Sequence, residues 1–202
     1  YFCPTGTVNP TLNTTLECPR GHRCPRGSGA PDPCPPGMYQ DVAKQSYCKM
    51  CLPGYYCPDV LGTTDPVVCG EGKYCEEGSS DETPCPLGNY QPAEGKRYCQ
   101  SCPEGYYCGV DSGTIDPLPC QTGEKCPTNS SHPIPCDEGT YTFQNKSATC
   151  EACPAGYYCD INLKTEEIQT TICPKGHSCP EGSTEPTVCP RGTYSNVEGS
   201  SY

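Results

Sequence analysis

The stretch CPLGNYQPAEGKRYCQSCPEGYYC, residues 85–108, contains the pattern on which the whole architecture rests. It twice places a glycine three residues after a cysteine, at Gly88 and Gly105, and it ends in a Tyr-Tyr-Cys triplet. The same frame of cysteines recurs 51 residues earlier, from Cys34, and 51 residues later, from Cys136. A fixed period of this kind is typical of proteins built from tandem repeats. We therefore expect an array of cysteine-rich repeats.

The recurring frame divides the chain into complete and partial repeats. The first residues, Tyr1-Phe2-Cys3, align with Tyr55-Tyr56-Cys57, so the sequence begins inside a repeat. We expect the 202 residues to belong to a longer array. The expected division is a partial repeat at 1–33, complete repeats at 34–84, 85–135 and 136–188, and the start of a further repeat at 189–202.

Cysteine has to supply the stability that a hydrophobic core supplies elsewhere. The chain has 22 Cys, but only two Phe, seven Leu, eight Val and five Ile, and no Trp. Such a chain buries too little apolar area to offset the entropy of ordering its backbone. Its 22 Gly and 25 Pro favour turns. We predict a small disulfide-rich fold, mostly irregular with short β-hairpins and little or no helix, extended as an elongated rod of tandem cysteine-rich repeats.

The cysteine content also predicts the compartment, because so many thiols pair only under oxidising conditions, which indicates an extracellular or cell-surface location. Zinc binding is the alternative, since C-x-x-C pairs like those of zinc knuckles begin at Cys48, Cys99 and Cys150. Each repeat lacks a second knuckle of that spacing, however, and no βαβ pattern of a redox site surrounds the pairs. We therefore expect disulfides, with no metal and no other cofactor.

The frame resembles the ephrin-receptor-like cysteine-rich repeat. Residues Cys85–Cys108 carry C-P-x-G-x-Y followed by C-x-x-C-P-x-G-Y-Y-C, and thirteen residues separate the first cysteines of the two motifs. The copy at Cys34–Cys57 differs in having Leu52-Pro53 after its third cysteine, and the copy at Cys136 has lost the first proline. The layout is also similar to tumour-necrosis-factor-receptor and laminin-type EGF-like repeats. The resemblance implies an extracellular module of surface and matrix proteins, without implying one activity.

The likeness to tumour-necrosis-factor-receptor repeats implies that cysteines pair one with two, three with five and four with six, although sequence alone does not fix the connectivity. The bridge between the first two would close a 15-residue loop, worth about 3 kcal/mol. Cys18 and Cys189 would then pair outside the sequence. The implied bridges are Cys34–Cys48, Cys51–Cys69, Cys57–Cys75, Cys85–Cys99, Cys102–Cys120, Cys108–Cys126, Cys136–Cys150, Cys153–Cys173, Cys159–Cys179 and Cys3–Cys24.

Two other recurring residue types are assigned structural roles. A glycine three residues after a cysteine is expected to adopt positive φ in a turn. A tyrosine pair that runs into a cysteine is expected to cover a disulfide with its rings and to leave the hydroxyls at the surface. Tyrosines presented as a ladder to a ligand are the alternative. The glycines are Gly37, Gly54, Gly72, Gly88, Gly105 and Gly123, and the tyrosine pairs are Tyr55-Tyr56, Tyr106-Tyr107 and Tyr157-Tyr158.

No arrangement of side chains indicates an enzyme, and we expect no catalytic residue. His22 and His177 occupy equivalent places where other repeats have lysine or glutamate, so they are interpreted as variable loop tips, and His132 stands alone. Acidic pairs such as Glu76-Glu77 are interpreted as solvated loop charges, because no EF-hand frame contains them. A calcium ion held between repeats is the alternative.

The net charge and the glycosylation motifs indicate which molecules the chain can bind or carry. The formal net charge is −11 and no basic run exceeds two residues, which excludes nucleic acid and anionic membranes as favoured partners. Acceptor motifs for N-glycosylation predict glycans at Asn13, Asn129 and Asn145, whereas Asn9 is blocked by Pro10.

The function expected from these features is structural: a disulfide-stapled repeat rod that acts as an extracellular spacer, coat or fibre subunit. Such a protein would associate with itself or with neighbouring repeats of the same longer chain, because a constant cysteine frame with varying loops reflects a demand on geometry alone. The alternative is a ligand-binding or adhesion segment of a cell-surface receptor ectodomain. For a protein ligand, the candidate contact is the loop Asp160–Thr171, which carries three aliphatic residues.

Overall fold

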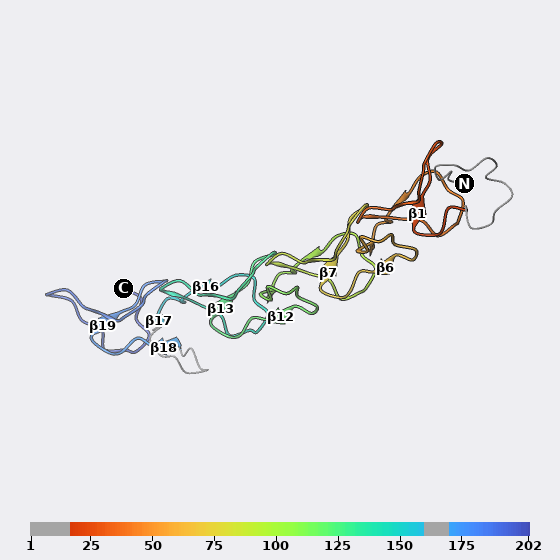
Figure 1. The fold of residues 1–202 in the computed structure, drawn as a ribbon. Helices are drawn as coiled ribbons and strands as arrows, with labels where there is room; N and C mark the ends of the chain where they lie inside the picture. Colours follow the sequence, from red (N-terminus) through yellow and green to blue (C-terminus); the bar gives the residue numbers. More distant parts are fainter. Residues whose placement is uncertain (1–16, 160–169) are drawn as a thin grey trace. The chain divides into compact units, whose positions relative to one another are not determined.

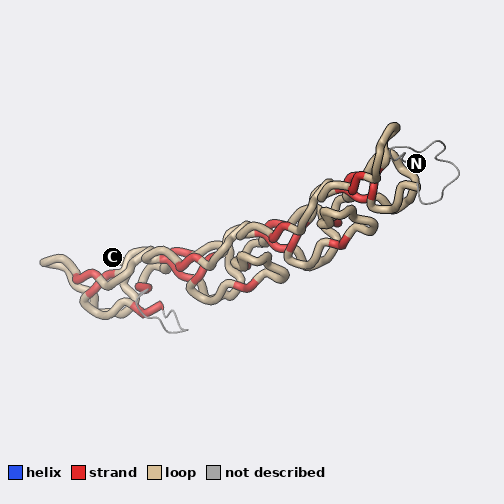
Figure 2. Tube along the Cα trace, in the orientation of Figure 1, coloured by secondary structure: helices blue, strands red, loops and turns tan. Residues whose placement is uncertain are grey.

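A computed structural model describes residues 17–159 and 170–202. Within these ranges the chain forms twenty very short strands and no helix (Figure 1). Figure 2 shows that loops and turns make up most of the trace. The prediction of a small disulfide-rich fold of short hairpins is confirmed. No helix in the described residues is long and apolar enough to cross a membrane.

The strands pair in sequence order into ten antiparallel two-stranded hairpins, β1 with β2, β3 with β4 and so on to β19 with β20. Their bounds are β1 His22–Arg23, β2 Asp32–Pro33, β3 Met38–Tyr39, β4 Lys49–Met50, β5 Tyr55–Tyr56, β6 Val67–Val68, β7 Lys73–Tyr74, β8 Thr83–Pro84, β9 Asn89–Tyr90, β10 Gln100–Ser101, β11 Tyr106–Tyr107, β12 Leu118–Pro119, β13 Glu124–Lys125, β14 Ile134–Pro135, β15 Thr140–Tyr141, β16 Glu151–Ala152, β17 Tyr157–Cys159, β18 Thr170–Ile172, β19 His177–Ser178 and β20 Thr187–Val188.

Every described hairpin opens in the same way. Its first strand begins four residues after a cysteine and one residue after a glycine, as β5 does after Cys51 and Gly54. The ten glycines in this position have φ between 71° and 88°, a backbone region that L side chains rarely adopt. The positive φ predicted for Gly37, Gly54, Gly72, Gly88, Gly105 and Gly123 is thus confirmed. Each complete repeat of the sequence therefore contains three hairpins of one design.

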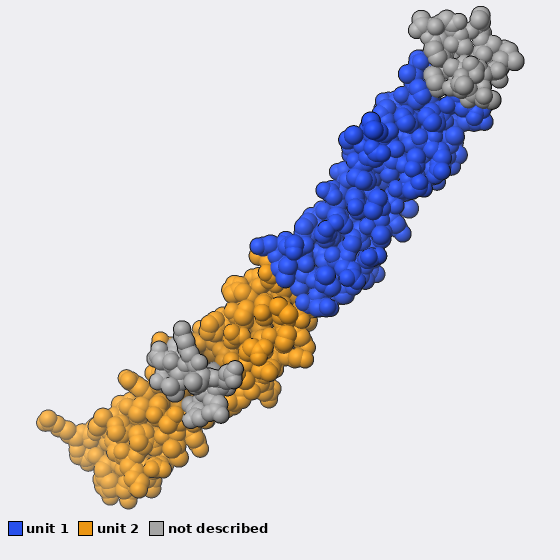
Figure 3. Space-filling view, turned by 60° about the horizontal axis from the view of Figure 1, so that its bottom comes forward, with its two compact units in different colours: residues 1–86, 90–100, 110–116 blue, residues 87–89, 101–109, 117–202 orange. Residues whose placement is uncertain are grey.

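The hairpins belong to two compact units, which are coloured separately in Figure 3. Compact unit 1 comprises residues 1–86, 90–100 and 110–116, and compact unit 2 comprises residues 87–89, 101–109 and 117–202. The chain passes from one to the other after residues 86, 89, 100, 109 and 116. The first four hairpins, β1 to β8, lie in compact unit 1, and the hairpins from β11 onward lie in compact unit 2.

Ten disulfides are present in the described residues, one to a hairpin, and each starts at the cysteine that opens the hairpin. Seven join cysteines that are six residues apart: Cys18–Cys24, Cys51–Cys57, Cys69–Cys75, Cys102–Cys108, Cys120–Cys126, Cys153–Cys159 and Cys173–Cys179. Three join cysteines that are fourteen residues apart, and their hairpins are called wide hairpins below. These three bridges, Cys34–Cys48, Cys85–Cys99 and Cys136–Cys150, agree with the implied pairing.

The crossed bridges implied by the tumour-necrosis-factor-receptor likeness are wrong. The chain reverses at the glycine three residues after the first cysteine, so the cysteine six residues along returns to the same side. The Cα atoms of Cys51 and Cys57 are 6.0 Å apart, within the range that a disulfide spans. The incorrect pairs are Cys51–Cys69, Cys57–Cys75, Cys102–Cys120, Cys108–Cys126, Cys153–Cys173 and Cys159–Cys179.

The ends of the chain require two further corrections. Cys24 pairs with Cys18, so the implied Cys3–Cys24 bridge and the outside partner for Cys18 are both wrong. Cys3 lies outside the described residues. Cys189 is half-buried and has no disulfide partner in the described part of the chain.

The apolar part of the buried interior consists of cysteine side chains. Among the described residues, every apolar side chain that is buried is a cysteine, and most of these have no exposed surface. Larger apolar side chains remain at the surface, such as Val60 and Leu61, which are 67% and 74% exposed. The structure therefore agrees with the prediction from composition, because disulfides occupy the interior that aliphatic side chains fill in an ordinary core.

Main-chain hydrogen bonds hold neighbouring hairpins in register. The N–H of the cysteine that opens a hairpin donates to the glycine carbonyl of the hairpin before it, as Cys69 does to Gly54 (2.9 Å) and Cys173 to Gly156 (2.9 Å). The N–H of Gly54 in turn donates to the carbonyl of Cys75 in the next hairpin, at 2.8 Å. These bonds involve no side chain, so the loops can vary in sequence without changing the stacking.

Non-reducing proteolysis tests the corrected pairing. Cleavage before aspartates cuts the chain at Asp65 and Asp81, on either side of Cys69 and Cys75. We expect mass spectrometry to find peptide 65–80 released alone, with one internal disulfide, because that bridge closes within the peptide. Reduction should then add the mass of two hydrogen atoms. Recovery of peptide 65–80 attached to the peptide that contains Cys57 would contradict the pairing of cysteines six residues apart.

Candidate functional site

The wide hairpins have a buried polar side chain where the other hairpins have their second cysteine. Six residues after the first cysteine stand Gln40, Gln91 and Thr142, which are 0%, 2% and 7% exposed. The next cysteine comes eight residues later, so a longer loop is closed by the bridge. Sequence analysis missed these three residues, whose only signal is a polar residue at the place of a cysteine.

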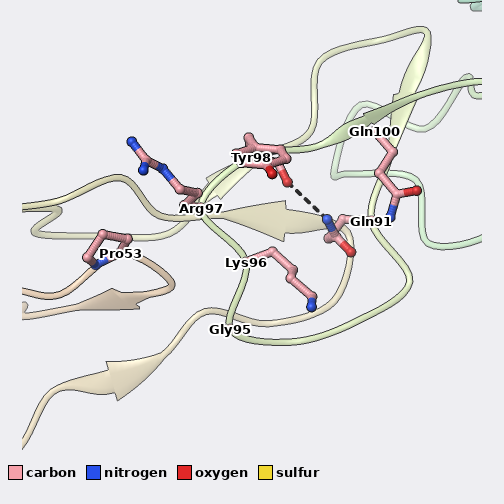
Figure 4. Close-up of a pocket in the computed structure, with 7 residues that line it drawn as sticks. All are labelled: Pro53, Gln91, Gly95, Lys96, Arg97, Tyr98 and Gln100. Atoms are coloured by element: carbon pink, nitrogen blue, oxygen red, sulfur yellow. Dashed lines mark hydrogen bonds between the residues drawn. The ribbon is translucent and has the colours of Figure 1, made fainter.

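The buried glutamine fixes the shape of its loop. The Gln91 Nε2 donates to the carbonyl of Tyr98 at 2.9 Å, and its Oε1 accepts from the N–H of Ala93 at 3.3 Å (Figure 4). Gln40 makes the same two bonds, to Tyr47 and Val42, at 2.7 and 3.2 Å. A buried amide with both ends satisfied holds a loop in one conformation, because opening the loop would leave polar atoms unpaired.

Each of two wide hairpins carries a surface groove in the same place. In compact unit 1 a groove of about 450 Å³ is lined by Pro53, Gln91, Gly95, Lys96, Arg97, Tyr98 and Gln100, and is called the Lys–Arg groove (Figure 4). In compact unit 2 a groove of about 340 Å³, called the Glu groove, is lined by Glu104, Tyr141, Thr142, Phe143, Gln144, Lys146, Ser147, Ala148, Thr149 and Glu151. Pro53 and Glu104 are 51 residues apart, as are Gln100 and Glu151, so the groove follows the repeat.

The Lys–Arg groove has unneutralised positive charge. Lys96 and Arg97 are the one adjacent pair of basic residues in the sequence, and both side chains are exposed. No carboxylate of the described residues lies within ion-pair distance of either. Tyr98, the next residue, is 67% exposed. Two cations and an aromatic ring thus line a groove whose loop is fixed by Gln91.

Most other described basic side chains are neutralised. Lys49, in the wide hairpin before the Lys–Arg groove, is 2.6 Å from a carboxylate oxygen of Asp41, and this hydrogen bond lowers the pKa of Asp41. A hydrogen bond from Lys73 likewise lowers the pKa of Glu82. These pairs are still partly open to solvent and contribute little to stability. The ion pairs are Arg20–Asp65, Arg23–Asp32, Lys44–Glu17, Lys49–Asp41, Lys73–Glu82 and Lys125–Asp137.

The Glu groove has a different chemistry on the same scaffold. Glu104 and Glu151 replace the Pro53 and Gln100 of the other groove. The rings of Tyr141 and Phe143 pack with their centroids 4.7 Å apart. The ammonium of Lys146 lies 5.1 Å from the centroid of the Tyr106 ring, which is within the range of a cation–π interaction.

The residues singled out by sequence lie at different places. Asn129 and Asn145 are exposed, and Asn129 has a φ of 68° in a turn, while Asn13 lies outside the described residues. Glycosylation of all three stays a prediction. The candidate loop Asp160–Thr171 also lies outside the described residues up to position 169, and its last two residues belong to β18.

Two of the three histidines lie on strands rather than at loop tips. His22 and His177 belong to β1 and β19, and the Nδ1 of each is 3.1 Å from the carbonyl oxygen two residues earlier. This backbone bond gives both rings a structural role. In the described residues no group of three or more His, Cys, Asp or Glu side chains is placed to hold a metal ion.

The sequence is similar to short parts of large modular proteins, and no family model matches it. It is 29% identical over 207 residues to the mouse Sushi, von Willebrand factor type A, EGF and pentraxin domain-containing protein 1, covering 99% of this chain and 6% of that protein. It is 30% identical over 142 residues to the zebrafish Signal peptide, CUB and EGF-like domain-containing protein 2, covering 64% and 14%. An amphioxus (Branchiostoma californiense) proprotein convertase subtilisin/kexin type 5 is 30% identical over 139 residues, covering 62% and 8%.

These likenesses and the disulfides lead to one general conclusion. The chain spans less than a sixth of the length of each of these relatives, so it corresponds to a segment of them. Two of the three are described by their EGF domains, which are disulfide-rich modules. Ten disulfides also require an oxidising compartment. The chain is an extracellular cysteine-rich repeat segment.

Proposed function

We propose that this segment is a non-catalytic structural spacer of the ephrin-receptor-like kind, which separates other parts of an extracellular protein. The observation that carries the proposal is the main-chain hydrogen bonding between hairpins. In both compact units the cysteine that opens a hairpin donates to the glycine carbonyl of the hairpin before it. Stability that comes from near neighbours is the property of repeat arrays, which grow in length without needing a larger core.

The cystine interior supports the same proposal. A spacer must keep its local structure although it has little interior, and covalent bridges provide this without apolar burial. The side chains between the cysteines are free to vary, because the contacts between hairpins are made by backbone atoms. The contacts expected of such a spacer are those with neighbouring repeats of the same longer chain.

Small-angle X-ray scattering of the oxidised chain tests the spacer. A compact globule of 202 residues would have a radius of gyration of about 17 Å. We expect a clearly larger value and an asymmetric distance distribution, with a scattering mass that does not change with concentration. A radius near the compact value would contradict the spacer, and a mass that grows with concentration would favour a fibre subunit instead.

A second candidate function is supported by the Lys–Arg groove, namely a contact with a protein ligand. Its loop is held in one conformation, and its two cations are without carboxylate partners among the described residues. A segment that acts purely as a spacer has no need for such a surface. The two functions are compatible, because a spacer can present one contact site on one of its repeats.

A further inference from the structure

We propose that the Lys–Arg groove binds a short, extended acidic peptide segment of a partner protein, which presents two separate carboxylates and an apolar or aromatic side chain. This deepens the second candidate function and rests on it. The spacer function does not depend on the groove, because scattering tests it separately.

Two carboxylates are required by the directions of the basic side chains. Figure 4 shows Lys96 and Arg97 leaving the loop in opposite directions. A single carboxylate could not pair with both. Arg97 offers a planar guanidinium that can hold one carboxylate through two parallel hydrogen bonds, whereas Lys96 offers a point charge. The favoured ligand therefore crosses this loop and has one acidic residue on the Lys96 side and another on the Arg97 side.

The remaining lining favours a peptide with an apolar or aromatic residue. Tyr98 is 67% exposed beside the two cations, and Pro53 comes from the hairpin that begins at Cys51. Both present apolar surface on which a side chain of the ligand can pack. Gln100, also exposed, offers an amide that can bond to a ligand main chain. An extended peptide can present two separate carboxylates, an apolar or aromatic side chain and free main-chain groups, since its successive side chains point to opposite sides.

A long polyanion fits the groove less well. The chain has a formal net charge of −11, so a nucleic acid or a densely sulfated polysaccharide that ran beyond the groove would meet repulsion. Only two unpaired basic residues line the groove, and the corresponding groove 51 residues later carries Glu104 and Glu151. The attraction is confined to one groove, which favours a short ligand with few charges.

The rigid loop makes the groove suitable for recognition. Gln91 is 2% exposed and holds the carbonyl of Tyr98, and Gly95 has a φ of 69° in the same loop. The N–H of Cys75 donates to the carbonyl of Lys96 at 2.9 Å, which joins the loop to a neighbouring hairpin. A groove whose backbone is already fixed loses little entropy when a ligand binds.

Fluorescence anisotropy tests the proposal with a fluorescein-labelled peptide of alternating glutamate and tyrosine and with a matched peptide that has glutamine instead of glutamate. The proteins are the unchanged chain, the double variant Lys96→Gln/Arg97→Gln, and the control Lys175→Gln/Arg191→Gln. The control removes the same charge from two exposed basic residues in compact unit 2. Release of peptide 65–80 on non-reducing proteolysis checks that the Cys69–Cys75 bridge is correctly formed in each protein.

We expect the acidic peptide to bind the unchanged chain and the control equally, and to lose at least about tenfold in affinity for the Lys96/Arg97 variant. The glutamine peptide should bind none of them detectably. Equal affinity for the unchanged chain and the Lys96/Arg97 variant would overturn the proposal. Binding of a heparin fragment in place of the acidic peptide would also overturn it, because the ligand would then be a polyanion.

Discussion

Replacing Gly113 by alanine is expected to destabilise the oxidised chain by more than about 3 kcal/mol. Gly113 has a φ of 102°, and a Cβ built on it would lie 2.0 Å from the carbonyl oxygen of Gly72, two hairpins earlier. No rotation of a side chain can relieve a contact with main-chain atoms. The substitution therefore combines the cost of a left-handed backbone for an L residue with the cost of separating two hairpins.

Two other glycines serve as controls in urea denaturation of the oxidised protein. Gly27 has a φ of 90° with no atom within 4 Å of the position that an alanine Cβ would take, so alanine there should cost only about 1 kcal/mol for the backbone. Gly29 has neither a positive φ nor a near atom, so alanine there should change stability by less than about 0.5 kcal/mol. If the Gly113 variant were no less stable than the Gly27 variant, close glycine packing would not be what holds alternate hairpins together.

The close approach of alternate hairpins could not be predicted from the sequence. The glycines three residues after each cysteine were predicted to have positive φ, because a recurrent glycine in a turn has that use, and they do. Gly113 and Gly72 lie 41 residues apart, however, and belong to hairpins that are not adjacent along the chain. Their contact depends on how far each hairpin is rotated relative to the next, and no local pattern specifies that rotation.

The disulfide pairing was predictable only in part, for a related reason. The three wide bridges were expected because each joins the first cysteine of a repeat to the next one along the chain, whereas the remaining four cysteines of each repeat allowed several connectivities. The signal that decides between them was present: residues 51–57 and 69–75 share the frame of a glycine midway between two cysteines. Each frame is one turn, and a turn brings its own two ends together. The shared turn was not recognised because the repeat was defined by its period of 51 residues, and one such period contains three hairpins of one design.

The candidate site lay in residues that sequence analysis had no reason to select. Gln91 looks like any polar loop residue until the hairpins are aligned on their first cysteines, when it falls at the place of a cysteine. The pair Lys96-Arg97 served in the sequence only to show that basic runs are short. Its importance depends on the lack of a carboxylate partner among residues 17–159 and 170–202, and side chains such as Asp41 and Glu82 are distributed by the fold and not by sequence distance.

Removing the bridge Cys69–Cys75 by substituting both cysteines with alanine is expected to destabilise its surroundings by about 4 kcal/mol. The chain-entropy model assigns about 2.4 kcal/mol to a loop of this length. Both cysteines are fully buried, so the loss of two sulfur atoms from the interior adds about 2 kcal/mol. The N–H groups of Gly54 and Gly95 donate to the carbonyls of Cys75 and Cys69, each at 2.8 Å, and should exchange with deuterium about a thousandfold faster.

The equivalent bridge Cys173–Cys179 provides the reciprocal experiment in compact unit 2. Its cysteines are also fully buried, and they accept from the N–H groups of Gly199 and Gly156 with the same 2.8 Å geometry. Removing it should speed the exchange of Gly156 and Gly199 and leave the amides next to Cys69–Cys75 protected. If either deletion instead accelerated all four amides equally, the chain would unfold as one cooperative body. A purely local effect of each deletion is required of a spacer, because an array stabilised by near neighbours loses one bridge without losing the rest.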